Sequence, residues 1–352
     1  MKSIFSQKSS APGVDLGNRW AKLVQLQPKR KKTELASLGR FLWKQEENQN
    51  RAMAASKMND IWNNLGISEK KVVSALAGHG VIIKHFSLSA QNQDMDSAIK
   101  QHARDYNFPF DLNEVYLDYQ FLDTDSDGQS IKTVLVASKM SVVDDIREFF
   151  QTASLSLNIV DIEGFALCNC FEFNYPERAS EPAYILDIGS TSSIFAVYAQ
   201  GYPQFIRDMS IGGEQITRII AQGLDVDLTS AERIKLSGTD QTDTQNWSKV
   251  TREIRDTFAS WTDDVQRLIT LYQNAQEHGT KEEVSKLYLA GGGSLLPGIK
   301  EAFAKELNLE VEHINPLRNI SYSERYFDPA YLDSSGPQFA VATGLALRGL
   351  EG

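Results

Sequence analysis

Two short segments, half a chain apart, share one pattern. Residues 13–27 (GVDLGNRWAKLVQLQ) and residues 186–200 (LDIGSTSSIFAVYAQ) each run from apolar residues through Asp-x-Gly into a second β-rich run. Apolar strands on either side of a glycine turn predict a β-hairpin. We call these the first and second hairpins. They indicate that the 352-residue chain is an internal duplication, with one hairpin opening each half.

The residues at these turns suit a triphosphate. Glycine has no side chain to hold the backbone away, so its turns can aim N–H groups at phosphate oxygens. Asp15 and Asp187, one in each hairpin, can hold a Mg²⁺ ion that keeps several waters. A single Asp-x-Gly turn is more simply structural. Two such turns, with a third glycine turn at 291–294, predict ATP binding.

The third turn follows an apolar strand and opens a helix, in KLYLAGGGSLLPGIKEAF. The N-terminal amides of that helix can face an anion or an adenosine. The turn is not a P-loop, because Ile299 stands where that motif requires lysine.

Between the hairpins the apolar residues follow a different pattern. Apolar spacing predicts strands at 81–88, 114–122 and 131–138, a helix that contains Met95 and Ile99, a second helix around 143–150, and a closing strand in SLNIVDIEG. Strand-helix-strand-strand-helix-strand is the pattern of a small α+β module. In the second half, apolar residues from Ile254 to Tyr272 predict one long amphipathic core helix.

Two charged segments have competing interpretations. Asp123-x-Asp125-x-Asp127-Gly128 matches the first half of a calcium loop, but the required glutamate is missing, so a hairpin turn is favoured. The run at 29–32, Lys-Arg-Lys-Lys, is favoured as a solvated hairpin turn. The alternative is a contact with an anionic membrane surface.

Composition excludes several classes. The net charge of −10 lacks the basic footprint of a nucleic-acid binder. Cys168 and Cys170 are too few and too close for a disulfide framework, which favours a reducing compartment. Neither a HExxH motif nor a Cys/His cluster is present. With no signal peptide and no apolar run of about 20 residues, we expect a cytoplasmic protein.

The order of these motifs resembles the actin-like ATPase superfamily, through GVDLGN, LDIGST, LAGGGSLL and two connecting segments, AERIKLSG and FAVATGLALRG. Within it the sequence resembles the PilM family of type IV pilus assembly proteins, through GVDLGNRWAKLVQL, IVDIEGFAL, FIRDMSIGGEQIT, LAGGGSLLPGIKEAF, INPL and ATGLALRG. FtsA carries a similar inserted module, but is typically longer and ends in an amphipathic membrane helix. This chain ends in LALRGLEG, which favours PilM.

The resemblance implies an α/β, actin-like ATPase fold of two duplicated lobes with an inserted small α+β module. The expected segments are a first lobe at 13–81 and 163–200, the module at 82–162, a second lobe at 201–340, and a C-terminal return to the first lobe at 341–352.

The resemblance also implies a set of site residues. Glu232 and Lys235 would grip the ribose and adenine, and Asp15 and Asp187 would hold Mg²⁺. PilM-like sequences usually have small residues where this chain has Arg19-Trp20; Arg19 can pair with a phosphate or crowd the turn, which bears on hydrolysis more than on binding. The whole expected ATP set is Asp15, Gly17, Asn18, Lys22, Asp187, Gly189, Ser190, Thr191, Gly213, Glu232, Lys235, Gly291, Gly292, Gly293 and Ser294.

The function implied is a cytoplasmic ATP-binding adaptor with slow or no ATP hydrolysis. It would lie against the inner membrane through its partners and bind the cytoplasmic N-terminal peptide of a PilN-like membrane protein in a groove near the module. Two alternatives are an FtsA-like cell-division filament protein and a sugar-kinase-like enzyme. A kinase needs a general-base aspartate, and none beyond Asp15 and Asp187 is evident.

Overall fold

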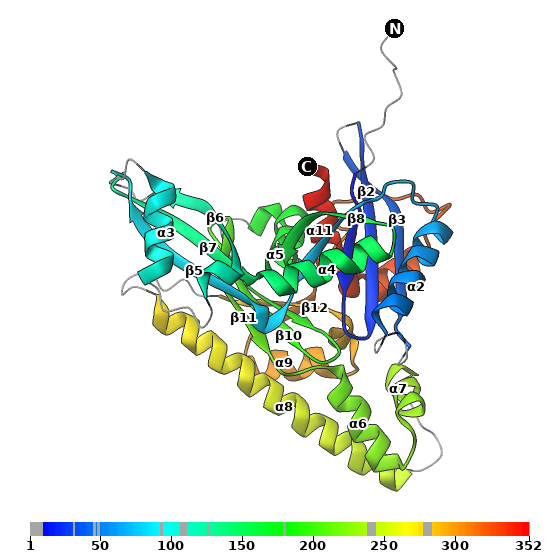
Figure 1. The fold of residues 1–352 in the computed structure, drawn as a ribbon. Coiled ribbons are helices and arrows are strands. Elements are labelled where there is room, and N and C mark those ends of the chain that lie inside the picture. The colour runs from blue at the N-terminus through cyan, green and yellow to red at the C-terminus, as the bar shows by residue number, and fades with distance from the viewer. Residues whose placement is uncertain are drawn as a thin grey trace.

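The structure is a computed structural model of the full chain. Figure 1 shows two sheets side by side, a smaller lobe that projects to one side, and a long helix, α8, along the base. The described residues are 10–30, 32–44, 47, 50–91, 94–105, 111–124, 127–178, 181–237, 244–276 and 284–351.

The first sheet is built around the first hairpin. Its five strands lie in the order β3-β2-β1-β4-β8, with β1 antiparallel to β2 and parallel to β4. The second strand of the hairpin continues into β3, and β4 and β8 add on the other side as parallel strands. The bounds are β1 (Gly13–Leu16), β2 (Trp20–Lys29), β3 (Lys32–Leu42), β4 (Lys71–Leu76) and β8 (Ser156–Ile162).

The second sheet repeats the first. Its order is β11-β10-β9-β12-β13, again with two antiparallel pairs followed by two parallel ones. The central strand β9 corresponds to β1, and each carries the aspartate of its hairpin near its end. The bounds are β9 (Ala183–Ile188), β10 (Ser193–Ala199), β11 (Tyr202–Met209), β12 (Lys286–Ala290) and β13 (Glu310–His313). The expected duplication is therefore confirmed by strand order.

Two helices fill the space between the sheets. α5 (Glu163–Asn174) and α11 (Ala340–Glu351) share one buried cluster with side chains of both sheets, such as Val73 and Ile185. The helices touch closely: a Cβ at Gly344 would lie 1.7 Å from the carbonyl oxygen of Ala166, so only glycine fits there. Cys168 and Cys170 are free thiols buried in α5.

Other helices cover the outer faces. α2 (Arg51–Asn64) and α4 (Met140–Thr152) pack on the first sheet, where Trp62 and Phe150 are fully buried. The outer face of the second sheet is covered by α6 (Gly213–Leu224), α8 (Thr244–Ala275) and α9 (Ile299–Leu307). The expected long helix is α8, and it buries Phe258, Trp261 and Val265. A short helix, α10 (Pro329–Ser335), precedes α11.

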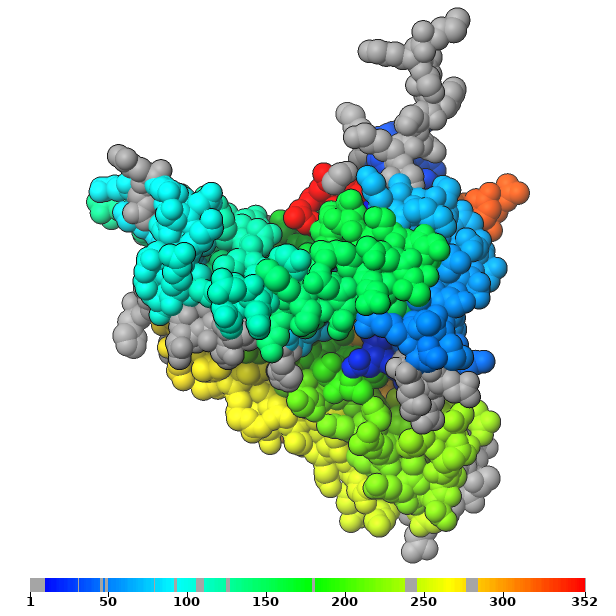
Figure 2. All heavy atoms as spheres, viewed as in Figure 1, coloured from blue at the N-terminus to red at the C-terminus, as the bar shows by residue number. Residues whose placement is uncertain are grey.

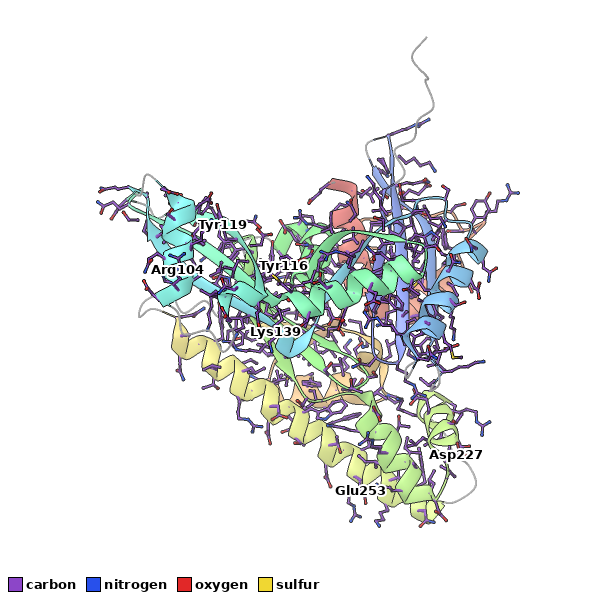
Figure 3. All side chains as sticks on the ribbon, viewed as in Figure 1. Arg104, Tyr116, Tyr119, Lys139, Asp227 and Glu253 are labelled. Atoms are coloured by element: carbon purple, nitrogen blue, oxygen red, sulfur yellow. The ribbon has the colours of Figure 1, made fainter. Side chains whose placement is uncertain are left out.

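The projecting lobe is a three-stranded antiparallel sheet in the order β5-β7-β6 with α3 on one face. Ile99 and Ala103 of α3 are buried against it, and the hydroxyl of Tyr119 donates to Asp96 (Figure 3). β6 and β7 pair on either side of Asp127-Gly128, as a hairpin would. Its elements are β5 (Val81–Ser89), α3 (Met95–Asp105), β6 (Val115–Thr124) and β7 (Ser130–Lys139).

Strand pairing corrects two of the expected boundaries. The module was expected to reach residue 162, but α4 packs on the first sheet and β8 pairs with β4, so these elements belong to the first sheet. Residues 183–199 were expected in the first lobe, but β9 and β10 form the centre of the second sheet. The physical reason is that each hairpin starts its own sheet. The other boundaries stay predictions.

Candidate nucleotide-binding site

The turns of the two hairpins meet. The side-chain amide of Asn18, in the first turn, donates a hydrogen bond to the hydroxyl of Thr191, in the second. Each turn is also held locally. The Gly17 carbonyl accepts from Trp43 Nε1 at 3.0 Å, and the Gly189 N–H donates to the Ser192 carbonyl at 3.0 Å. Turns that are far apart in sequence are therefore brought to one place between the sheets.

The first hairpin carries a buried ion pair. Lys22 lies directly across the strands from Asp15, and its Nζ donates to Asp15 Oδ2 at 2.7 Å. Burial acts to lower the pKa of Lys22, but attraction to Asp15, helped by the charges of Asp187 and Glu163, outweighs it and raises that pKa. Lys22 therefore stays protonated beside Asp15, where its positive charge can attract a phosphate.

The second hairpin has no such pair. Ile194 occupies the position across the strands from Asp187. Burial raises the pKa of Asp187 to about 7; the charge of Lys22 opposes this rise and that of Asp15 adds to it. A buried carboxylate that is costly to ionise gains most from an incoming cation.

The third turn is pressed against Asp187. Gly291 has φ +80°, and a Cβ there would lie 2.2 Å from Asp187 Oδ1, so the turn requires glycine. The Ser294 hydroxyl is fully buried and donates to the Gly291 carbonyl at 2.7 Å, so it shapes the turn from inside. The glycines continue into a short 3₁₀ helix, Gly292–Leu295, and α9 begins only at Ile299, later than expected.

The expected Glu232 and Lys235 lie on α7 (Leu228–Ser237), whose first turn is capped by the Asp227 carboxylate (Figure 3). Their charged groups are 2.7 Å apart. Lys235 Nζ also donates to the Gly213 carbonyl at 3.2 Å, and the Gly213 N–H donates to the Gly189 carbonyl at 3.0 Å. This links α7 through α6 to the second hairpin.

Burial in the α7 pair affects the two partners differently. Burial acts to raise the pKa of Glu232, but hydrogen bonds from Lys235 and Thr217 outweigh it and lower that pKa. Burial lowers the pKa of Lys235, and the bond to Glu232 offsets part of this effect. Arg19 joins the group: its Nε lies 3.6 Å from Glu232 Oε1. The Arg19 side chain therefore bridges the first hairpin to α7.

Sequence reasoning missed Glu163, the first residue of α5. Burial, followed by the charges of Asp15 and Asp187, raises the pKa of Glu163 to about 8, while Lys22 opposes the rise. The available signal was an acid directly after the strand in IVDIEG, because β8 runs parallel to β4 and β1 and ends at the same edge of the sheet. Glu163 is thus a third acid beside the two hairpin aspartates.

A metal site made only of side chains does not fit. In the described part of the chain, no set of three or more His, Cys, Asp and Glu side chains is arranged to hold a metal ion. Asp15 and Asp187 instead suit an ion that takes most of its ligands from water and phosphate oxygens, as Mg²⁺ does. The raised pKa of Asp187 is consistent with a site that favours a cation.

Solved structures with a similar fold include three that span nearly the whole chain. A PilM-PilN type IV pilus biogenesis complex matches with a TM-score of 0.84 and 24% identity, over 97% of this chain and 99% of that one. The MreB5 protein of Spiroplasma citri bound to ADP matches with a TM-score of 0.56 and 10% identity, over 97% and 96%. The ethanolamine utilization protein EutJ of Carboxydothermus hydrogenoformans matches with a TM-score of 0.53 and 15% identity, over 96% and 89%.

These likenesses confirm the expected actin-like fold with two repeated sheets. The model of the family described as type IV pilus assembly protein PilM matches residues 13–350, nearly the whole sequence. The chain therefore belongs to the PilM family of type IV pilus assembly proteins.

Proposed function

We propose that this protein binds Mg-ATP between its two sheets and acts as an adaptor of the pilus assembly platform, on the cytoplasmic side of the inner membrane, with slow or no hydrolysis. One observation supports this most strongly: the Asn18–Thr191 bond joins the two hairpin turns, and Gly291 of the third turn packs against Asp187. Three glycine turns from distant parts of the chain thus surround one group of acids and one lysine.

Each group has a role in this proposal. The backbones of the Gly17 and Gly189 turns approach the phosphates, and Lys22 supplies positive charge from below. Asp15 and Asp187 hold the waters of the metal ion, which when bound would neutralise phosphate charge. The Glu232–Lys235 pair and the open side of Gly292 border the nucleoside. The Glu163 carboxyl, beside both aspartates, is positioned to orient a water if hydrolysis occurs.

The adaptor role requires a partner-binding surface that is coupled to nucleotide binding between the two sheets. A cavity of about 210 Å³ lies where the module, the first sheet and the second sheet meet. Ile82 of β5, Ile206 of β11 and Glu163 itself line this cavity. We propose that an apolar side chain of a PilN-like N-terminal peptide enters here, so that binding is coupled to closure around nucleotide. A complex of PilM with PilN among the similar structures supports a partner of this kind.

A calorimetric titration with Mg-ATP tests the nucleotide site. We expect binding by the parent protein and by the surface variant Asp263→Ala, and its loss in Asp187→Ala with the thermal transition retained. A parent protein that is folded but gives no heat, or an Asp187→Ala variant that binds as the parent does, would exclude the assignment.

Peptide binding is tested separately. Pull-down with a PilN-like N-terminal peptide should capture the parent protein but not Ile82→Glu, which places a charge in the cavity. Ile131→Glu is the matched control, because Ile131 lies at the opposite end of the β5–β7 pair and does not line the cavity. Equal capture of both variants would place the peptide elsewhere.

A further inference from the structure

The β2–β3 hairpin ends in a cluster of positive charge. The two strands pair as far as Lys29 and Lys32, and Arg30 takes the left-handed turn conformation, with φ 57°. Lys29 is neutralised by an ion pair with Glu34. Arg30 and Lys32 are exposed, and within the described residues neither has a carboxylate partner. Two free cations therefore stand at the end of a hairpin with strands of 10 and 11 residues.

A second exposed segment is hydrogen-bonded to β3 of this hairpin, close to the turn. The Leu35 N–H donates to the Ser321 carbonyl at 2.8 Å, and the Ser321 N–H donates to the Thr33 carbonyl at 3.0 Å. The chain then runs to Tyr326, which at 74% exposed is the most exposed of the large hydrophobic side chains described. The guanidinium of Arg325 lies 5.6 Å from the Tyr326 ring. Figure 2 shows this segment, in orange, projecting from the body.

The combination selects one kind of partner. The protein carries a net charge of −10, so it repels a polyanion as a whole, and a projecting positive tip is the kind of feature that can overcome this repulsion locally. Nucleic-acid binding favours a basic groove with bases stacked along it, whereas this feature is a tip. Tyrosine and arginine with apolar bodies and polar ends are the residues that settle at a bilayer interface.

We propose that the patch of Arg30, Lys32, Arg325 and Tyr326 contacts the headgroup region of an anionic lipid bilayer. Arg30 and Lys32 lie in the diffuse field of the headgroups, while Tyr326 enters the interface with Arg325 beside it. The protein would then bind the membrane surface directly, in addition to any association through a partner protein. In the described part of the chain, no helix is long and apolar enough to cross a membrane.

The experiment uses the full chain with vesicles that contain no protein. We expect co-sedimentation with vesicles of phosphatidylglycerol and phosphatidylcholine, much weaker binding to phosphatidylcholine alone, and a loss of binding as salt rises. Since each basic residue strengthens such binding about fivefold, the double variant Arg30→Ser/Lys32→Ser should bind about 25-fold more weakly. Tyr326→Ser should weaken binding by a smaller factor.

The matched control, Lys249→Ser/Arg252→Ser, removes the same charge from the exposed face of α8 and should bind as the parent does. Equal vesicle binding by the two double variants, or no preference for anionic vesicles, overturns the proposal. So does tighter binding to single-stranded nucleic acid that displaces the vesicles. Mg-ATP titration of the same variants shows that each is folded and keeps this test separate from the nucleotide site.

Discussion

The two hairpins occupy the same place in two equivalent sheets, yet they differ at one cross-strand position. In the first, Lys22 faces Asp15 and forms a buried ion pair at 2.7 Å. In the second, Ile194 faces Asp187, and the pKa of that carboxyl rises to about 7. The two similar turns therefore differ in charge at one cross-strand position, where one has lysine and the other isoleucine. The first hairpin holds a buried positive charge beside its aspartate, and the second holds an aspartate whose pKa lies near neutral pH.

The largest expected effect separates the two aspartates. Truncating one member of a buried charge contact costs about 2 to 5 kcal/mol, so Asp187→Ala should weaken Mg-ATP binding by roughly a thousandfold. Asp15→Asn should weaken it much less in the presence of Mg²⁺, because Lys22 remains and is freed toward the phosphates. Calorimetry on both variants decides the matter, and equal losses would mean that the two hairpins are not specialised.

Glu163 lies beside both aspartates, so a change at Glu163 tests a part of the site that is common to the two hairpins. Glu163→Gln keeps the size of the side chain but removes its ability to accept a proton. Any residual ATP turnover should fall about a hundredfold, the lower range for loss of a general base, while Mg-ATP affinity stays within a few-fold. Phosphate release and calorimetry on one preparation measure both. Unchanged turnover would remove Glu163 from the reaction.

Lys22→Met turns the first hairpin into a copy of the second. Breaking a buried pair costs about 3 to 5 kcal/mol, but Asp15 can take up a proton, so we expect a loss of about 2 kcal/mol at pH 7. Because the orphaned acid would bind protons more readily in the folded form, the loss should shrink at pH 5. Denaturant unfolding at both pH values measures it. A stability loss independent of pH would point to packing instead of charge.

The smallest effect concerns pH. Asp187 must lose its proton to favour a cation, so Mg-ATP affinity should rise by up to about tenfold per pH unit below 7 and level off above it. The free energy of unfolding changes with pH in the opposite direction. Because the pKa of Asp187 is raised in the folded protein, this residue opposes folding increasingly as pH rises from 3.8 toward 7. Calorimetry in buffers of different ionisation heat should detect proton release when Mg-ATP binds. The Asp187→Asn variant should release fewer protons, because it lacks the proton that Asp187 gives up.

Much of the fold could be predicted because its signals are local. The hairpins, the glycine turns and the long helix α8 follow from the spacing of apolar residues and from turn chemistry. The Gly291 turn also required only local sequence. The meeting of the turns was inferred from the order of the motifs, and the Asn18–Thr191 bond gives that inference its geometry.

The features that could not be predicted depend on contacts between residues that are far apart in the sequence. Whether β8 closes the module or extends the first sheet is decided by its register with β4, about 85 residues earlier in sequence. Glu163 gained its importance only when strand ends converged, and Arg19 reached Glu232 across the site instead of remaining at its own turn. The inward-facing Ser294 hydroxyl likewise depended on how its turn folds back.

The position of α11 has a consequence for the order of folding. Residues 340–347 of this helix are buried against α5 and against strands of the first sheet, where Ala342 touches Gly13. During synthesis, the faces of β1 and β2 that α11 covers in the finished protein stay uncovered until more than 300 further residues have been made. A nascent chain in that interval would be a natural client for chaperones, and its two halves would reach their final form together.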